Sequence, residues 1–210
     1  MAGLSYLTDY PPAKNPVVVV SPQFLAPYPV DLIITKKLFK LGETNFEIAD
    51  VNGKIFFTLK SKFISLRDRR VLLDASGAPL LTLQQKIITA HRRWQVFKGG
   101  STDQKDLLFS AKKSSLIQLK TELFVFLAQN TSESACDFKV KGSWLERACT
   151  IYLGDSNTII GQMHKQHTVQ SILLDKDSFA VTVYPHVDYA FIVALVIILY
   201  EINEDRSGDD

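Results

Sequence analysis

YAFIVALVIILY, residues 189–200, is the stretch of sequence that decides the fold of this chain. It contains no charged residue, and Asp188 precedes it while Glu201 follows it. A helix of roughly twelve to fourteen residues spans about 20 Å, whereas the hydrocarbon of a bilayer is about 30 Å thick, so this segment is too short to cross a membrane. Because its surface is apolar on every side, protein must surround it. The stretch predicts an interior helix over residues 188–202, buried through Tyr189, Phe191, Leu195 and Ile198.

Short β-branched and aromatic runs, separated by turn residues, precede this segment. Asp50 and Gly53 lie in a tight-turn sequence between two such runs, and Asp74 and Gly77 repeat the arrangement. The pattern predicts an all-β domain of mainly antiparallel strands. A sheet that closes around the helix buries both elements, and a barrel that houses a helix needs more than eight strands.

The length of 210 residues suits a single folding unit. Six of the eight prolines lie between Pro11 and Pro29, which disfavours regular structure there. We therefore expect a flexible Pro-rich N-terminal tail over residues 1–16 and one barrel domain over residues 17–203. An acidic disordered tail is expected over residues 204–210.

The cysteine content and the N-terminus favour an intracellular protein. Cys136 and Cys149 indicate neither a disulfide framework nor a zinc site, and a reducing compartment explains them more simply. The first residues carry no signal peptide, and Ala2 stands where myristoylation requires glycine. We expect a cytoplasmic location, with the plasma-membrane periphery or the nucleus as alternatives.

Five stretches resemble one known family. They are APYP at residues 26–29, VLLDASG at 71–77, RWQVFKG at 93–99, KGSW at 141–144 and PHVDYAF with ALV between residues 185 and 196. With these stretches the chain resembles the plant LURP-one-related proteins over nearly its whole length. That family is similar to the Tubby C-terminal and phospholipid scramblase superfamily, which implies a closed barrel of about twelve strands around a central hydrophobic C-terminal helix. His186 departs from the family pattern, which most often has glycine after the proline.

The resemblance implies a biological context but no agreed biochemical activity. Tubby domains bind phosphoinositides, some of them have been proposed to act in transcription, and scramblases are tied to lipid movement and calcium. LURP-one relatives are associated with plant pathogen defence. Fold-level analogy transfers none of these activities by itself.

No local motif indicates catalysis, a metal or a cofactor. His164 and His167 come nearest to a metal motif, but residues three apart on a strand point to opposite faces. The turns at Asp50 and Asp74 lack the ligand series of a calcium-binding loop. A nucleophile–base motif such as G-x-S-x-G is also missing from the sequence. We therefore expect a protein that is not an enzyme and has no metal and no cofactor.

Basic clusters are the most informative candidate for binding. Lys139 and Lys141 flank Val140, so both should project from one face of a strand. A second basic strand beside them would complete a groove for phosphates, and we assign it to Arg67, Arg69 and Arg70. Further pairs are Arg92 with Arg93 and Lys112 with Lys113, and the alternative for all of them is a solvated barrel exterior.

The functional hypothesis is a non-enzymatic membrane-surface binding or tethering module in plant defence-related signalling. It would recognise phosphoinositide headgroups through this basic groove. The alternatives are a protein-interaction adaptor or membrane-tethered transcription-related factor, which needs an exposed apolar patch, and a hidden enzyme, which needs a deep cleft. Anionic phospholipid headgroups and proteins are the expected partners of a monomer without a transmembrane span.

Nucleic acid is not an expected partner. The formal net charge is +2 and the pI is about 8.4, below the value of a dedicated nucleic-acid binder. Trp94 and Trp144 border apolar runs, and packing in the core or at the barrel rim is the preferred interpretation over stacking on bases.

Overall fold

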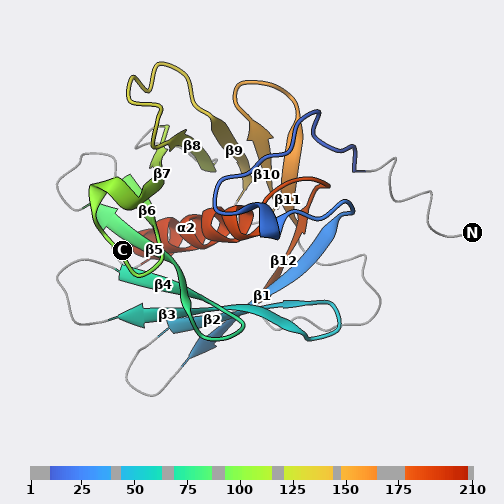
Figure 1. The fold of residues 1–210 in the computed structure, drawn as a ribbon, viewed down its shortest axis with the longest axis vertical. Coiled ribbons are helices and arrows are strands. Elements are labelled where there is room, and N and C mark those ends of the chain that lie inside the picture. Colours follow the sequence, from blue (N-terminus) through green and yellow to red (C-terminus); the bar gives the residue numbers. More distant parts are fainter. Residues whose placement is uncertain are drawn as a thin grey trace, which may run out of the picture.

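Twelve strands form a closed barrel around one central helix in this computed structural model, which describes residues 10–38, 44–62, 69–86, 93–114, 121–143, 148–164 and 178–207 (Figure 1). The strands are β1 (Val30–Leu38), β2 (Thr44–Asp50), β3 (Ile55–Lys62), β4 (Arg69–Asp74), β5 (Pro79–Lys86), β6 (Arg93–Lys98), β7 (Leu107–Lys113), β8 (Thr121–Leu127), β9 (Phe138–Ser143), β10 (Ala148–Leu153), β11 (Ile159–His164) and β12 (Ser178–Val183). Two short 3-10 helices, η1 (Pro22–Phe24) and η2 (Gln104–Asp106), and the helix α2 (Tyr189–Ser207) complete the described elements.

The barrel is an antiparallel meander in which each strand pairs with its neighbours in sequence. β1 pairs with β12 and closes the barrel, with Val30 opposite Val183 and Ile34 opposite Phe179. Side chains alternate between the interior and the outer face, as in β9, where Phe138 and Val140 are buried. Closure leaves no unpaired edge among these strands.

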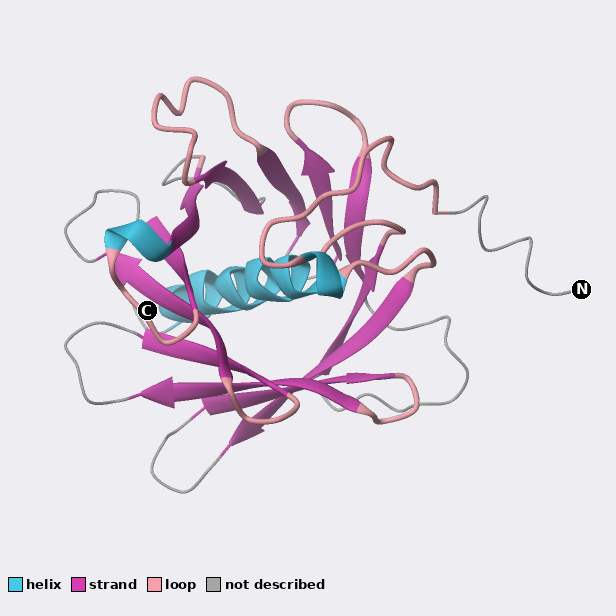
Figure 2. Cartoon of the chain, viewed as in Figure 1, coloured by secondary structure: helices cyan, strands magenta, loops and turns pink. Residues whose placement is uncertain are grey.

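The helix α2 fills the barrel interior, and Figure 2 shows it surrounded by strands. Every residue of α2 from Ala190 to Leu199 is fully buried. Phe191 contacts two strands, with ring centroids 5.1 Å from Phe109 and 4.7 Å from Phe138. The predicted closed barrel of about twelve strands around a hydrophobic C-terminal helix is therefore confirmed.

The bounds of α2 differ from those predicted. Asp188 lies just before the helix, which continues to Ser207 instead of ending at residue 202. Residues 204–207, predicted to begin an acidic disordered tail, are helical because neither proline nor glycine interrupts the chain before Gly208. Among the described residues, no helix is both long enough and apolar enough to cross a membrane.

Residues 10–29, here named the strap, cross the end of the barrel where α2 begins. Val17 forms an isolated parallel bridge with Val187, and Tyr10 packs edge-on against Tyr184 at 5.1 Å. Ala13 is buried in the same core. Residues 10–16 were predicted as part of a flexible tail; of these, Tyr10 and Ala13 pack here, while the other five residues are exposed.

The two predicted turns are built around aspartate side chains. Asp50 Oδ1 accepts the backbone N–H groups of Asn52 and Lys54, each at 2.9 Å. Asp74 makes the equivalent contacts in the next hairpin. Gly53 and Gly77 have φ of +82° and +85°, a backbone conformation that glycine adopts without strain.

Trp94 is fully buried and faces the interior, whereas Trp144 lies outside the described residues. Cys136 and Cys149 are free thiols, the first half-buried and the second buried.

Candidate functional site

Because α2 occupies the interior, the candidate site lies on the outer face of the barrel. On β7, β8 and β9 the strand register places Lys112 opposite Phe124 and Phe124 opposite Lys139. Arg93 on β6 extends this line. Its neighbour Trp94 pairs with Ala111, which precedes Lys112 on β7. We name Arg93, Lys112, Phe124 and Lys139 the outer basic row.

The loop over residues 128–137, between β8 and β9, reaches back over this row. Its base is held by two side chains: Asn130 Nδ2 donates to the Ala135 carbonyl and to Asp137 Oδ2, each at 2.9 Å, and Asp137 Oδ2 accepts the Leu127 N–H at 2.8 Å. Glu133, at its tip, has a positive φ of 49°. The loop therefore presents one carboxylate to the strands beneath it.

That carboxylate contacts two cations of the row. Arg93 donates to both oxygens of Glu133 through Nη1 and Nη2, and Lys112 Nζ lies 2.7 Å from Oε2. The hydrogen bonds from Arg93, followed by that from Lys112, hold the pKa of Glu133 at about 2. Glu133 is consequently ionised throughout the physiological range, and the network that depends on it weakens only in strong acid, as pH falls from about 4.5 toward 2.

Lys139, the third cation of the row, forms its ion pair on the other side of Phe124. Lys139 Nζ lies 2.6 Å from Asp155 Oδ1, in the turn between β10 and β11. The hydrogen bond from Lys139 lowers the pKa of Asp155, and that contact raises the pKa of Lys139. Burial and the nearby charge of Asp155 raise the pKa of the Cys136 thiol. Cys136 therefore stays protonated near neutral pH.

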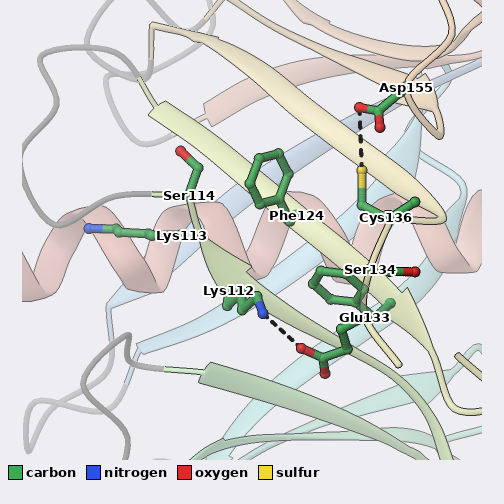
Figure 3. A pocket seen from close by; sticks show the side chains of 10 residues that line it. Lys112, Lys113, Ser114, Phe124, Glu133, Ser134, Cys136 and Asp155 are labelled. Atoms are coloured by element: carbon green, nitrogen blue, oxygen red, sulfur yellow. Dashed lines mark hydrogen bonds and ion pairs between the residues drawn. The ribbon is translucent and has the colours of Figure 1, made fainter. Parts of the chain in front are cut away.

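A pocket of about 370 Å³ lies between the loop and the strands (Figure 3). Figure 3 shows Phe124 between Ser114 and Cys136, while the side chain of Lys113 points away from Phe124 and Glu133. The ammonium of Lys112 is 4.6 Å from the centre of the Phe126 ring. The full lining is Lys112, Lys113, Ser114, Phe124, Phe126, Glu133, Ser134, Ala135, Cys136 and Asp155.

Comparison with known proteins identifies the family. The family model for LURP-one-related proteins matches residues 30–200. The chain belongs to the LURP-one-related family. It is 53% identical to Protein LURP-one-related 15 of Arabidopsis thaliana, across 97% of this chain and 98% of that protein. It is 48% identical to Protein LURP1 of the same plant, across 91% of this chain and 92% of that protein.

A solved structure supports the fold of this LURP-one-related protein. An X-ray structure of a protein from Arabidopsis thaliana superimposes with a TM-score of 0.70 at 47% sequence identity, covering 89% of this chain and 98% of that chain. The family resemblance seen in the sequence is therefore confirmed.

The predicted basic groove does not form as proposed. Lys139 and Lys141 do share the outer face of β9, but β9 lies between β8 and β10, while Arg69 and Arg70 lie on β4. Apart from the closing β1–β12 pair, only strands that are consecutive in sequence are neighbours here, and β5 to β8 separate the two clusters. Arg67 lies outside the described residues.

Arg69 and Arg70, the two described arginines of the predicted groove, make contacts within the LURP-one-related barrel. Arg70 forms two hydrogen bonds of 2.9 Å with Glu201 near the C-terminal end of α2, and both side chains are largely buried. Arg69 Nη2 donates to the Gly100 carbonyl at 2.5 Å. Lys141 lies 3.4 Å from Glu122 on β8. Only Lys139 of the five predicted residues joins the outer basic row.

Sequence reasoning noted Arg93 and Lys112 as basic residues and did not assign them to the site, and it missed Glu133. Strand order was the available signal for the two cations, because a meander brings β6 and β7 close to β9. Glu133 carries no local signal, since its contact with Arg93 joins residues forty positions apart.

The histidine pair is only partly described. His164 Nε2 lies 2.9 Å from Thr182 Oγ1, whose hydroxyl donates to Asp31 Oδ1 at 2.6 Å. Burial lowers the pKa of His164, which keeps the ring neutral at pH 7. His167 lies outside the described residues. In the described part of the chain, no group of histidine, cysteine and acidic side chains is arranged to hold a metal ion.

Proposed function

We propose that this LURP-one-related protein is a non-enzymatic module that binds or tethers at a membrane surface by recognising phosphoinositide headgroups, in plant defence-related signalling. The observation that supports this is the outer basic row, where Lys112 and Lys139 flank Phe124 and Arg93 follows on the next strand, beside a pocket of about 370 Å³. Pockets that take small ligands start at about 300 Å³. The defence setting follows from the family's association.

The donor geometry suits a phosphate. A guanidinium presents parallel N–H groups that match two oxygens of a carboxylate or a phosphate. Arg93 donates to both oxygens of Glu133 in this way. Lys112 and Lys139 add point charges on either side of Phe124. A headgroup with phosphates on more than one ring position offers an anion for each side of Phe124.

The titratable groups favour binding over catalysis. A general acid or base works best with a pKa near the operating pH, yet the pKa of Glu133 is about 2. Burial raises the pKa of Cys149 to about 11, and the pKa of Cys136 is also raised, so neither thiol is activated as a nucleophile.

Liposome co-sedimentation tests the proposal. Vesicles of phosphatidylcholine with graded phosphatidylinositol bisphosphate should recover increasing amounts of protein at about 0.15 M salt. The double variant Lys112→Ala/Lys139→Ala should lose most of this recovery. Lys60→Ala/Lys98→Ala removes the same charge from exposed positions on β3 and β6 and should retain it. Equal recovery of the native protein with neutral and phosphoinositide vesicles would refute the proposal.

A further inference from the structure

Glu133 is the anion that Arg93 and Lys112 of the outer basic row contact in this structure. Resting on the proposed function, we propose that Glu133 is an internal competitor: its carboxylate holds Arg93 and Lys112 in the free protein, and a phosphomonoester of the ligand replaces it when the loop tip moves away. The ligand group is the same whether it belongs to a lipid headgroup or to a free inositol phosphate. Ligand affinity is then set by the loop as well as by the cations.

The cations are positioned without Glu133. Arg93 Nη1 also donates to Ser110 Oγ on β7 at 3.2 Å, and the ammonium of Lys112 rests over the ring of Phe126 on β8. Both side chains therefore have contacts with the strands themselves. A phosphate that displaces the carboxylate meets a donor set that is already arranged, so little ordering is needed on binding.

The loop tip can leave while the loop base stays in place. The contacts of Asn130 and Asp137 close the base and do not involve Glu133 side-chain atoms. Thr131, Ser132, Ser134 and Ala135 are exposed, so they gain little burial from the closed position. Glu133 itself has a positive φ, a conformation that a non-glycine residue adopts at some cost. Its side-chain ion pairs and the hydrogen bond from its backbone N–H to Asn130 Oδ1, at 3.1 Å, hold the tip closed, and only the ion pairs involve the cations that a phosphate would contact.

Both ion pairs are partly open to solvent. The side chains of Glu133 and Arg93 are each 23% exposed and that of Lys112 is 26% exposed. This exposure lets a ligand that carries more charge than a carboxylate reach the two cations and compete with Glu133 for them. A phosphomonoester near neutral pH carries between one and two negative charges and three acceptor oxygens, so it has the advantage.

Glu133→Gln is the test, with Glu122→Gln as the matched control. Glu122 lies on β8, pairs with Lys141 at 3.4 Å and does not line the pocket, so both variants lose one negative charge from the same region of the barrel. Affinity is measured on phosphatidylcholine vesicles with phosphatidylinositol bisphosphate and, separately, on free inositol trisphosphate. Glu133→Gln should bind on the order of tenfold more tightly, and Glu122→Gln less than about twofold.

The outcomes separate the two proposals. Binding by the native protein with equal changes in both variants, or with no change in Glu133→Gln, overturns the competitor role and leaves the proposed function standing. No binding by the native protein or by either variant overturns both. Tighter binding of vesicles alone identifies a lipid headgroup, whereas tighter binding of both probes identifies the phosphate-bearing ring itself.

Hydrogen exchange reports opening of the loop tip, which a change of net charge alone does not produce. The amides of residues 131–135 should exchange faster in Glu133→Gln than in the native protein, and faster in the native protein when inositol trisphosphate is bound. The amides of Asn130 and Asp137, at the loop base, should stay protected in every state. Unchanged exchange at the tip on binding overturns the displacement.

Discussion

At the scale of single residues, Asp188 connects the strap to the start of the central helix. Its Oδ2 accepts the backbone N–H groups of Val19, Val20 and Ser21 at 3.2, 2.6 and 3.1 Å, and its Oδ1 accepts that of Phe191 at 3.1 Å. Burial raises the pKa of this carboxyl, while the four donors act in the opposite direction. One fully buried side chain thus satisfies four backbone donors at the end of the barrel.

Replacing this carboxylate should be costly. Asp188→Ala leaves several partly buried N–H groups without an acceptor, and we expect the free energy of unfolding to fall by about 3 kcal/mol in urea titrations. Asp50→Ala removes an acceptor of two N–H groups in an exposed turn and should cost about 1 kcal/mol. Equal losses in the two variants would show that the strap contact adds no stability.

His186 occupies a backbone position that favours glycine. Its φ is +63°, and its N–H and carbonyl are fixed by the strap residues Ala26 and Val17. The left-handed conformation explains why the family pattern most often has glycine here. We expect His186→Gly to raise stability by about 0.5 kcal/mol, because glycine's extra flexibility in the unfolded chain offsets part of the gain.

His186→Val gives the opposite sign in the same experiment. A β-branched residue fits a positive φ poorly, so stability should fall by about 1 to 2 kcal/mol and the thermal midpoint should drop by a few degrees. A valine variant as stable as the native protein would show that this turn relaxes out of the left-handed region.

The two thiols should differ in reactivity. Burial alone raises the pKa of Cys149 to about 11, two units above its ordinary value, so its thiolate is about 100-fold scarcer near neutral pH. Cys136 is half-buried and should react faster with iodoacetamide. Mass spectrometry of timed samples measures both rates, with urea-unfolded protein as the control in which the two cysteines label alike. Equal labelling in the folded protein contradicts the burial of Cys149.

At the scale of elements, α2 is the core of the molecule. Ile198→Asp or Leu195→Asp places a charge in an apolar interior at a cost of several kcal/mol, comparable to the total stability of a domain. Both variants should lack a thermal unfolding transition. Val51→Asp, in the exposed turn between β2 and β3, is the control and should keep the native midpoint. A native midpoint for either helix variant would mean that α2 is not enclosed.

The same elements show what the sequence could predict. The helix was predictable because residues 189–200 are apolar on every side, and the turns at Asp50 and Asp74 because their residues act locally. The helix end was missed, since glycine and proline mark helix ends better than charge does. The sequence could not show that Lys139 and the predicted arginines lie on separated strands, because similar basic clusters occur on several strands. Only the order of strands in space brings Lys112 and Arg93 into line with Lys139.

At the scale of the whole molecule, closure joins the beginning and the end of the chain. β1 and β12 pair directly, although Val30 and Val183 are separated by nearly the whole domain. A barrel of this many strands leaves more interior than its own side chains can fill. The inward-facing residues of all twelve strands therefore depend on α2 for their packing, even though the helix is the last element made.

This dependence predicts that the barrel does not exist without its helix. A chain ending at Asp188 should lack a cooperative thermal transition and should aggregate in size-exclusion chromatography, because a wide apolar interior would be left open to water. A chain ending at Ser207 keeps all of α2 and should unfold in one transition at the native midpoint. The barrel and the helix are then a single cooperative unit. A monomeric, cooperatively unfolding chain that ends at Asp188 would instead show that the strands carry their own core, and the interior would become a candidate ligand cavity in place of the outer face.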